Sequence, residues 1–169
     1  MRFILCFFAF FLILCHGAAA KDARDYTHFS SIPVQHDGRI KPLSSFAKNL
    51  LYTYSGHDKI KDMDAQSWLA MSLFNPSDAI QTPVFRIFRP EILGLAAKDS
   101  PYYSLADIAP KLQERMNLIN TFAQIKPADL SRDQAEILRI KDNAESYIQL
   151  LRSFSFLLPL QLSLPPELM

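Results

Sequence analysis

Residues 33–43 read Pro33-Val34-Gln35-His36-Asp37-Gly38-Arg39-Ile40-Lys41-Pro42-Leu43, and this stretch sets the start of the fold. Asp37-Gly38 is a strong tight-turn signal, because glycine accepts a positive φ without steric cost. Val34 and Ile40 flank the turn, so we predict a small extended or hairpin segment that needs helices to pack on. Pro42 then opens a helix, where its missing N–H costs nothing.

The helix that Pro42 opens is predicted to stop at Gly56. Its apolar residues recur at the spacing of one helical face. They are Leu43, Phe46, Ala47, Leu50, Leu51 and Tyr54. A second helix is predicted from Asp64, a capping residue, to Phe74, with Trp68 facing inward.

Residues 83–90 alternate apolar and basic side chains between two prolines. This pattern predicts an edge strand or an extended arm, and residues 91–97 follow as a short helix. Ser104 and Asp107 then form a capping-box pair before a helix to about Ile125, and Ser131 with Gln134 caps another to roughly Phe156. Two long amphipathic helices with a short connection are expected to pack as an antiparallel hairpin, so the fold class is mainly α.

The N-terminus carries the pattern of an export signal. Arg2 precedes the apolar run 3–15, and Ala18-Ala19-Ala20 offers small residues for cleavage after Ala20. An uncleaved anchor is the alternative, and a lipoprotein acylated at Cys15 is weaker because Leu14 precedes it. We therefore predict a periplasmic or secreted protein with a signal peptide at 1–20, a linker at 21–32, one domain at 33–158 and a proline-rich tail at 159–169.

Composition excludes several functions for the chain after cleavage. Both cysteines, Cys6 and Cys15, lie in the signal segment, so thiol chemistry, Cys-ligated zinc and covalently attached c-type haem are excluded. Removal of Arg2 leaves 17 basic against 17 acidic residues, which gives no argument for binding nucleic acid. The apolar stretch 154–164 is broken by Pro159 and is too short to cross a membrane.

The sequence shows no catalytic or metal-binding constellation. Three histidines remain, His28, His36 and His57, and no two have the helical spacing of a zinc site. A nucleophile elbow and a phosphate-binding glycine loop are also missing. We therefore expect a protein that is not an enzyme and needs no cofactor or metal.

The segment Gln35–Lys41 has two interpretations. It is either a structural turn that orients the first helix, or a polar recognition surface on a rigid turn. If it is extended, strand alternation places Arg39 and Lys41 outward and Ile40 inward.

The stretch Val34–Leu43, with Phe46-Ala47 after it, resembles the extracytoplasmic part of bacterial system II cytochrome c biogenesis proteins of the CcsA/CcsB (ResC/ResB) type. The resemblance extends more loosely over residues 33–158, including Ser67-Trp68-Leu69 and Pro83–Ile87. That family exports haem and helps ligate it to apocytochrome c. Here Ser44-Ser45 replaces an acidic residue and threonine, Trp68 stands without the family's tryptophan-rich haem motif, and the family's membrane helices have no counterpart.

The resemblance implies an exported accessory or interaction module that assists cytochrome c assembly through a membrane-bound partner. The partner-binding candidates are Gln35, His36, Asp37, Arg39, Lys41 and Trp68. The alternative is a haem- or small-ligand-binding periplasmic carrier, with His36 or His57 as an axial ligand. A secreted hydrolase is a third hypothesis, which needs a cleft with a paired nucleophile and base.

Overall fold

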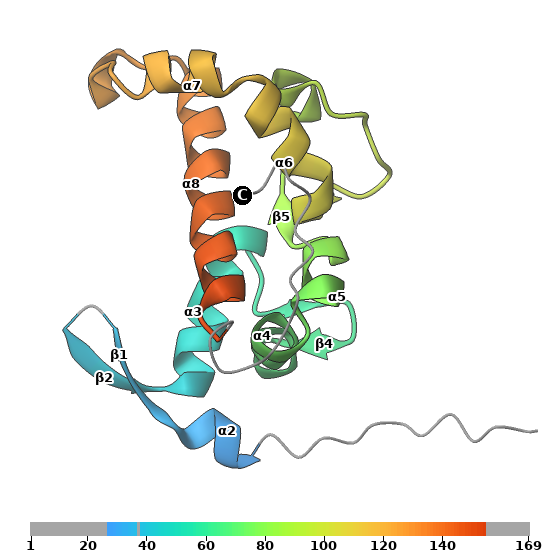
Figure 1. The fold of residues 1–169 in the computed structure, drawn as a ribbon, viewed down its shortest axis with the longest axis vertical. Helices are drawn as coiled ribbons and strands as arrows, with labels where there is room; N and C mark the ends of the chain where they lie inside the picture. Colours follow the sequence, from blue (N-terminus) through green and yellow to red (C-terminus); the bar gives the residue numbers. More distant parts are fainter. Residues whose placement is uncertain (1–26, 37, 155–169) are drawn as a thin grey trace, which may run out of the picture.

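The structure is a computed structural model that describes residues 27–36 and 38–154, and it is mainly helical, as predicted (Figure 1). The α-helices in the described ranges are α2 (Thr27–Ser31), α3 (Leu43–Ser55), α4 (Ala65–Phe74), α5 (Pro76–Gln81), α6 (Leu105–Glu114), α7 (Met116–Phe122) and α8 (Arg132–Arg152). The strands form three two-stranded antiparallel pairs, which are β1 (Pro33–His36) with β2 (Arg39–Pro42), β3 (Lys59–Ile60) with β4 (Met63–Asp64), and β5 (Phe85–Arg86) with β6 (Tyr102–Tyr103).

The first half of the chain follows the predicted boundaries closely. Pro42 precedes α3, and Gly56 ends it in the left-handed region with φ 73°. Asp64 caps α4, because its carboxylate accepts a hydrogen bond from the Ser67 backbone N–H at 2.7 Å. These signals act within one helical turn, so they could be identified without knowledge of the tertiary structure.

The middle of the chain is less regular than the sequence pattern suggests. Only Phe85 and Arg86 of the predicted arm form a strand, and Phe85 lies opposite Tyr103 of β6. The predicted helix at 91–97 is a 3-10 helix, η1 (Pro90–Leu93), which ends at Gly94. The short β5–β6 pair brings residues 85–86 beside the start of α6.

The prediction of one continuous helix to Ile125 is wrong. Helix α6 ends at Glu114, and α7 begins at Met116, because Arg115 leaves the helical region with φ −110° and ψ 10°. The Arg115 guanidinium donates a hydrogen bond to the Ile92 carbonyl oxygen at 2.7 Å, a contact with a residue 23 positions earlier. The first arm of the expected hairpin is therefore two helices, and α7 lies across the N-terminal end of α8 (Figure 1).

Two capping boxes begin the C-terminal helices where they were predicted. The Ser104 hydroxyl accepts from the Asp107 N–H, and the Asp107 carboxylate accepts from the Ser104 N–H. Ser131 and Gln134 make the equivalent pair at the start of α8. A second short 3-10 helix, η2 (Pro127–Asp129), connects α7 to α8.

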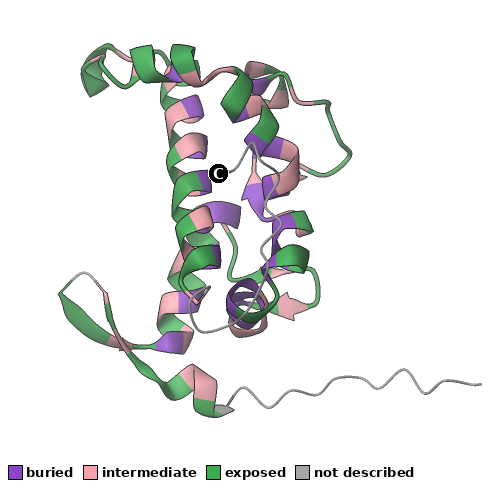
Figure 2. Cartoon of the chain, viewed as in Figure 1, coloured by how far each residue is buried: buried purple, intermediate pink, exposed green. Residues whose placement is uncertain are grey.

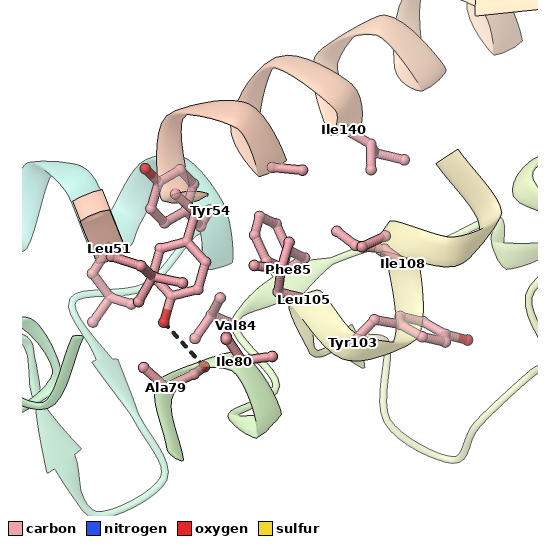
Figure 3. Packing of buried hydrophobic residues seen from close by; sticks show 14 of the residues in the cluster. Leu51, Tyr54, Ala79, Ile80, Val84, Phe85, Tyr103, Leu105, Ile108 and Ile140 are labelled. Carbon is pink, nitrogen blue, oxygen red and sulfur yellow. Dashed lines mark hydrogen bonds between the residues drawn. The ribbon is translucent and has the colours of Figure 1, made fainter. Parts of the chain in front are cut away.

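The core centres on four aromatic rings that come from four different elements. Tyr54 (α3), Trp68 (α4), Phe85 (β5) and Tyr147 (α8) are each at most 2% exposed. The Tyr147 ring centroid lies 5.5 Å from that of Tyr54, 5.9 Å from that of Trp68 and 5.6 Å from that of Phe85. Figure 3 shows Phe85 beside Leu105, with Leu51 and Tyr54 on one side and Ile108 and Ile140 on the other. This cluster joins α3 and α4 to α8, the last helix of the described chain.

The N-terminal end of the domain is more ordered than a linker. The predicted linker at 21–32 is described from Thr27 onward, and residues 27–31 form α2 beside α3 and are not an irregular linker. The predicted signal peptide, the start of the predicted linker and the predicted tail at 159–169 lie outside the described residues. Within residues 27–36 and 38–154, we find no helix with the length and apolar character that a membrane span requires.

Candidate functional site

The β1–β2 ribbon, residues 33–36 and 39–42, is the part of the molecule that extends away from the helical body (Figure 1). Its strands pair Pro33 with Pro42, Gln35 with Ile40 and His36 with Arg39. Gly38 in the connection has φ 71°, as the turn prediction required. Asp37, the other predicted turn residue, lies outside the described residues.

One face of the ribbon packs on α3. The His36 ring meets the Phe46 ring edge to face at a centroid distance of 5.2 Å. Val34 is half-buried against the core cluster, and Lys41, opposite it, places Nζ 3.5 Å from His36 Nδ1. Val34, His36 and Lys41 therefore hold the ribbon against the helix.

The other face of the ribbon is exposed to solvent and is more apolar than expected. Gln35 and Ile40 lie opposite each other on this face, between Pro33 and Pro42, and all four are exposed. Ile40 is 78% exposed, the highest value among the exposed large hydrophobic residues of the described chain. Figure 2 shows most of the ribbon as exposed.

The prediction that Ile40 points inward and Lys41 outward is therefore wrong. The period of a strand is two residues, so a shift of one residue exchanges the two faces. Here the contact of His36 with Phe46 selects the face that packs on α3, and Ile40 belongs to the opposite face. Polar residues in the segment suggested a polar surface, whereas its solvent face centres on isoleucine.

The predicted partner-binding residues fall into two groups. Gln35 and Arg39 are exposed, and His36 and Lys41 are half-buried, so these four lie together on the ribbon. Trp68 is 0% exposed in the core and does not join them. Its predicted contact with a partner is wrong for this fold, because the side chain is buried in the core against the rings of Tyr54 and Tyr147, as its helical pattern had predicted.

The aromatic core also perturbs the ionisation of two tyrosines. Burial raises the pKa of Tyr147 to about 12, although a hydrogen bond with the Ser72 hydroxyl opposes this. Burial likewise raises the pKa of Tyr54 to about 12, against a hydrogen bond with Ser146. The Tyr147 hydroxyl donates to the Ala79 carbonyl oxygen at 3.1 Å (Figure 3), which holds it as the neutral phenol.

The histidines are dispersed in the structure. His28 lies on α2, His36 packs on Phe46, and His57 lies at an exposed position just after α3, with its ring 6.4 Å from that of Tyr102. Among the described residues, no group of three or more His, Cys, Asp or Glu side chains is placed to hold a metal ion.

We compared the chain with known protein families, curated proteins and solved structures. No protein-family model, curated protein or solved structure matches this chain. Its function is therefore inferred from its own residues and their arrangement.

Proposed function

We propose that this protein is a non-enzymatic interaction module whose β1–β2 ribbon binds a protein partner. The observation that carries the proposal is Ile40, a large apolar side chain left 78% exposed on a ribbon that extends from the helical body. Burial of an isoleucine side chain contributes about 1.5–3 kcal/mol. A partner that covers Ile40 gains this contribution, which the domain itself leaves unused.

The backbone of the ribbon supports the same function. The described sheet has only β1 and β2, so each strand has one edge without a strand partner in that part of the chain. Extended segments of other proteins bind such edges through main-chain hydrogen bonds. Exposed Gln35, opposite Ile40 on the same face, adds a polar contact that favours one orientation of the partner.

We further propose that the partner is membrane-bound and belongs to the cytochrome c assembly machinery. What supports this class of partner is the resemblance of residues 33–47 to system II biogenesis proteins, together with the export-signal pattern of residues 1–20. In this proposal the module is exported to the periplasm and works beside the haem-handling proteins. The haem chemistry belongs to those proteins.

Site-specific crosslinking tests the ribbon directly. A photo-reactive residue replaces Ile40 in one variant and Phe88 in the control, because Phe88 is also a large hydrophobic residue and is 70% exposed elsewhere. We expect the Ile40 position to crosslink one membrane protein in cells and the Phe88 position to miss it. If both positions capture the same proteins, or neither captures any, the ribbon is not the binding surface.

Loss of the gene tests the biological role. We expect haem-stained c-type cytochromes to decrease in the deletion strain and to recover with the wild-type chain. Ile40→Ser should restore them less than Phe88→Ser does, at equal protein level. Normal levels of c-type cytochromes in the deletion strain would exclude a role in their assembly. The crosslinking result at Ile40 would still test whether the ribbon binds a partner.

A further inference from the structure

The β3–β4 turn contains a residue in an unfavourable backbone conformation. Two residues, Lys61 and Asp62, connect Ile60 to Met63, and Lys61 has φ 50°. It is the only non-glycine residue with a positive φ in the part of the chain that the structure describes. Glycine usually occupies such a position because it has no Cβ to approach the following carbonyl oxygen, and asparagine is tolerated because its short polar side chain can hydrogen-bond to the nearby backbone. Residues kept in this region often have a functional reason.

Lys61 lies at the edge of a cleft of about 260 Å³. The ionisable residues that line the cleft include His57, Lys59 and Lys61, and no aspartate or glutamate lines it. Neither Lys59 nor Lys61 forms an ion pair within the described ranges, whereas Lys98, on the following loop, contacts Asp107 at 2.8 Å. The lining of the cleft is therefore basic, with two lysines that form no ion pair in the described ranges.

The remaining wall of the cleft is suited to a small organic group. Ile60 and Pro83 give it an apolar surface and Ser100 adds a polar residue, while the Tyr102 hydroxyl donates to the Ser55 carbonyl oxygen at 3.4 Å. The Tyr102 ring lies 6.4 Å from the ring of His57, which places an aromatic face beside the basic residues. Small-ligand sites combine an apolar lining with a few polar groups in this way.

A second cleft next to the first provides a comparison within the molecule. It is larger, about 720 Å³, and more open, and it shares Lys61 with the first. Asp62 and Asp78 line it as well, so its charges are mixed. The excess of positive charge is therefore a property of the smaller cleft.

We propose that the smaller cleft binds a small organic anion, a carboxylate or a phosphate monoester that carries an apolar ring. Lys59 and Lys61 contact the anionic group, and Ile60, Pro83 and Tyr102 cover the ring. The position of Lys61 explains why a strained residue is kept in the turn, since glycine there would relieve the backbone and remove the charge. The site is independent of the ribbon and does not rest on its partner.

Titration of the purified protein with benzoate, phenyl phosphate and neutral benzamide tests the charge requirement. Amide chemical shifts in ¹H–¹⁵N spectra give the affinity and locate the site. We expect benzoate or phenyl phosphate to shift residues 57–61 and 100–102, and benzamide to bind at least tenfold more weakly. Equal binding of benzamide, or absence of shifts with all three compounds, overturns the proposal.

Lysine variants test the residues. Lys59→Met and Lys61→Met should each weaken anion binding at least fivefold, whereas Lys48→Met, on an exposed part of α3, should change it less than twofold. Lys61→Gly should lose binding as Lys61→Met does, with a thermal midpoint equal to or above that of the wild type. Lys59 lies in strand β3, where glycine is unfavourable, so Lys59→Gly should lower the thermal midpoint. Unchanged affinity in both Met variants, or an unstable Lys61→Gly protein, contradicts the assignment.

Discussion

The aromatic core and the β1–β2 ribbon differ in how many elements hold each side chain. Trp68 is enclosed by rings from α3 and α8 and is 0% exposed. Ile40, on a ribbon whose other face packs on α3, is 78% exposed. Both residues are large and apolar. The comparison shows that one position stabilises the domain and the other is available to a partner.

The largest effect is expected for the core position. Trp68→Ala should lower the free energy of unfolding by about 3–5 kcal/mol, because it leaves a cavity among closely packed rings. Ile40→Ala should change it by less than about 0.5 kcal/mol, since its side chain is already in water. Urea unfolding of both variants measures the difference. Similar losses would mean that the ribbon is part of the cooperative core.

A smaller effect should follow the ionisation of the core tyrosines. Tyr54 and Tyr147 have pKa values of about 12 in the fold and of 10.0 when unperturbed. The folded state thus holds the phenol protons more tightly, and the stability they contribute is complete below pH 10 and is lost as the pH rises to 12. The loss should be on the order of 2 kcal/mol for each tyrosine.

Phenylalanine variants identify the source of this alkaline destabilisation. Tyr147→Phe should lose about 1 kcal/mol at pH 8, because the Ala79 carbonyl oxygen loses its donor. Its stability should then fall less steeply than that of the wild type between pH 10 and 12. Tyr52→Phe is the matched control, since Tyr52 is 63% exposed. An identical slope in the Tyr147 variant would assign the alkaline loss to other groups.

The smallest effect concerns the two capping boxes, which differ in charge. Ser104→Ala and Ser131→Ala should each cost about 1 kcal/mol at pH 7. Burial of the Asp107 carboxyl opposes ionisation, but hydrogen bonds from Lys98 and Ser104 outweigh it and lower the pKa of Asp107. Its stabilisation is present at neutral pH and is lost as acid protonates it, whereas Gln134 stays neutral.

Acid unfolding therefore separates the two boxes. The cost of Ser104→Ala should decrease at low pH, while the cost of Ser131→Ala should stay constant. Chemical denaturation of both variants at pH 7 and pH 3 measures this, with Ser45→Ala, an exposed α3 residue, as control. The same pH dependence in both variants would rule out Asp107 as its source.

Local signals were predicted well because their atoms lie within a few residues of each other. The caps at Asp64, Ser104 and Ser131 and the stop at Gly56 each need three or four consecutive residues. The break at Arg115 was missed because the Ile92 carbonyl oxygen that it meets is remote in sequence. The spacing of apolar residues along a helix carries no information about a contact with a residue so far away in the sequence.

In the candidate site, too, the local feature was predicted and the feature that depends on a tertiary contact was not. The hairpin at residues 33–42 was indicated by Asp37-Gly38 and the flanking apolar residues. The choice of its buried face was not indicated, because Val34 lies in one phase of the strands and Ile40 in the other, so each face carried a large apolar residue. The packing of His36 on Phe46 made that choice and left Ile40 in solvent.

The helical class, the helix starts and the tight turn near residue 38 follow from the sequence, because backbone preferences and hydrogen bonds within one turn specify them. Three features depended on the tertiary structure. They are the helix break at Arg115, the exposed face of the ribbon, and the cleft that joins Lys59 and Lys61 to Tyr102. Each brings together residues distant in the chain, and only the packing of whole elements determines which side chains then meet.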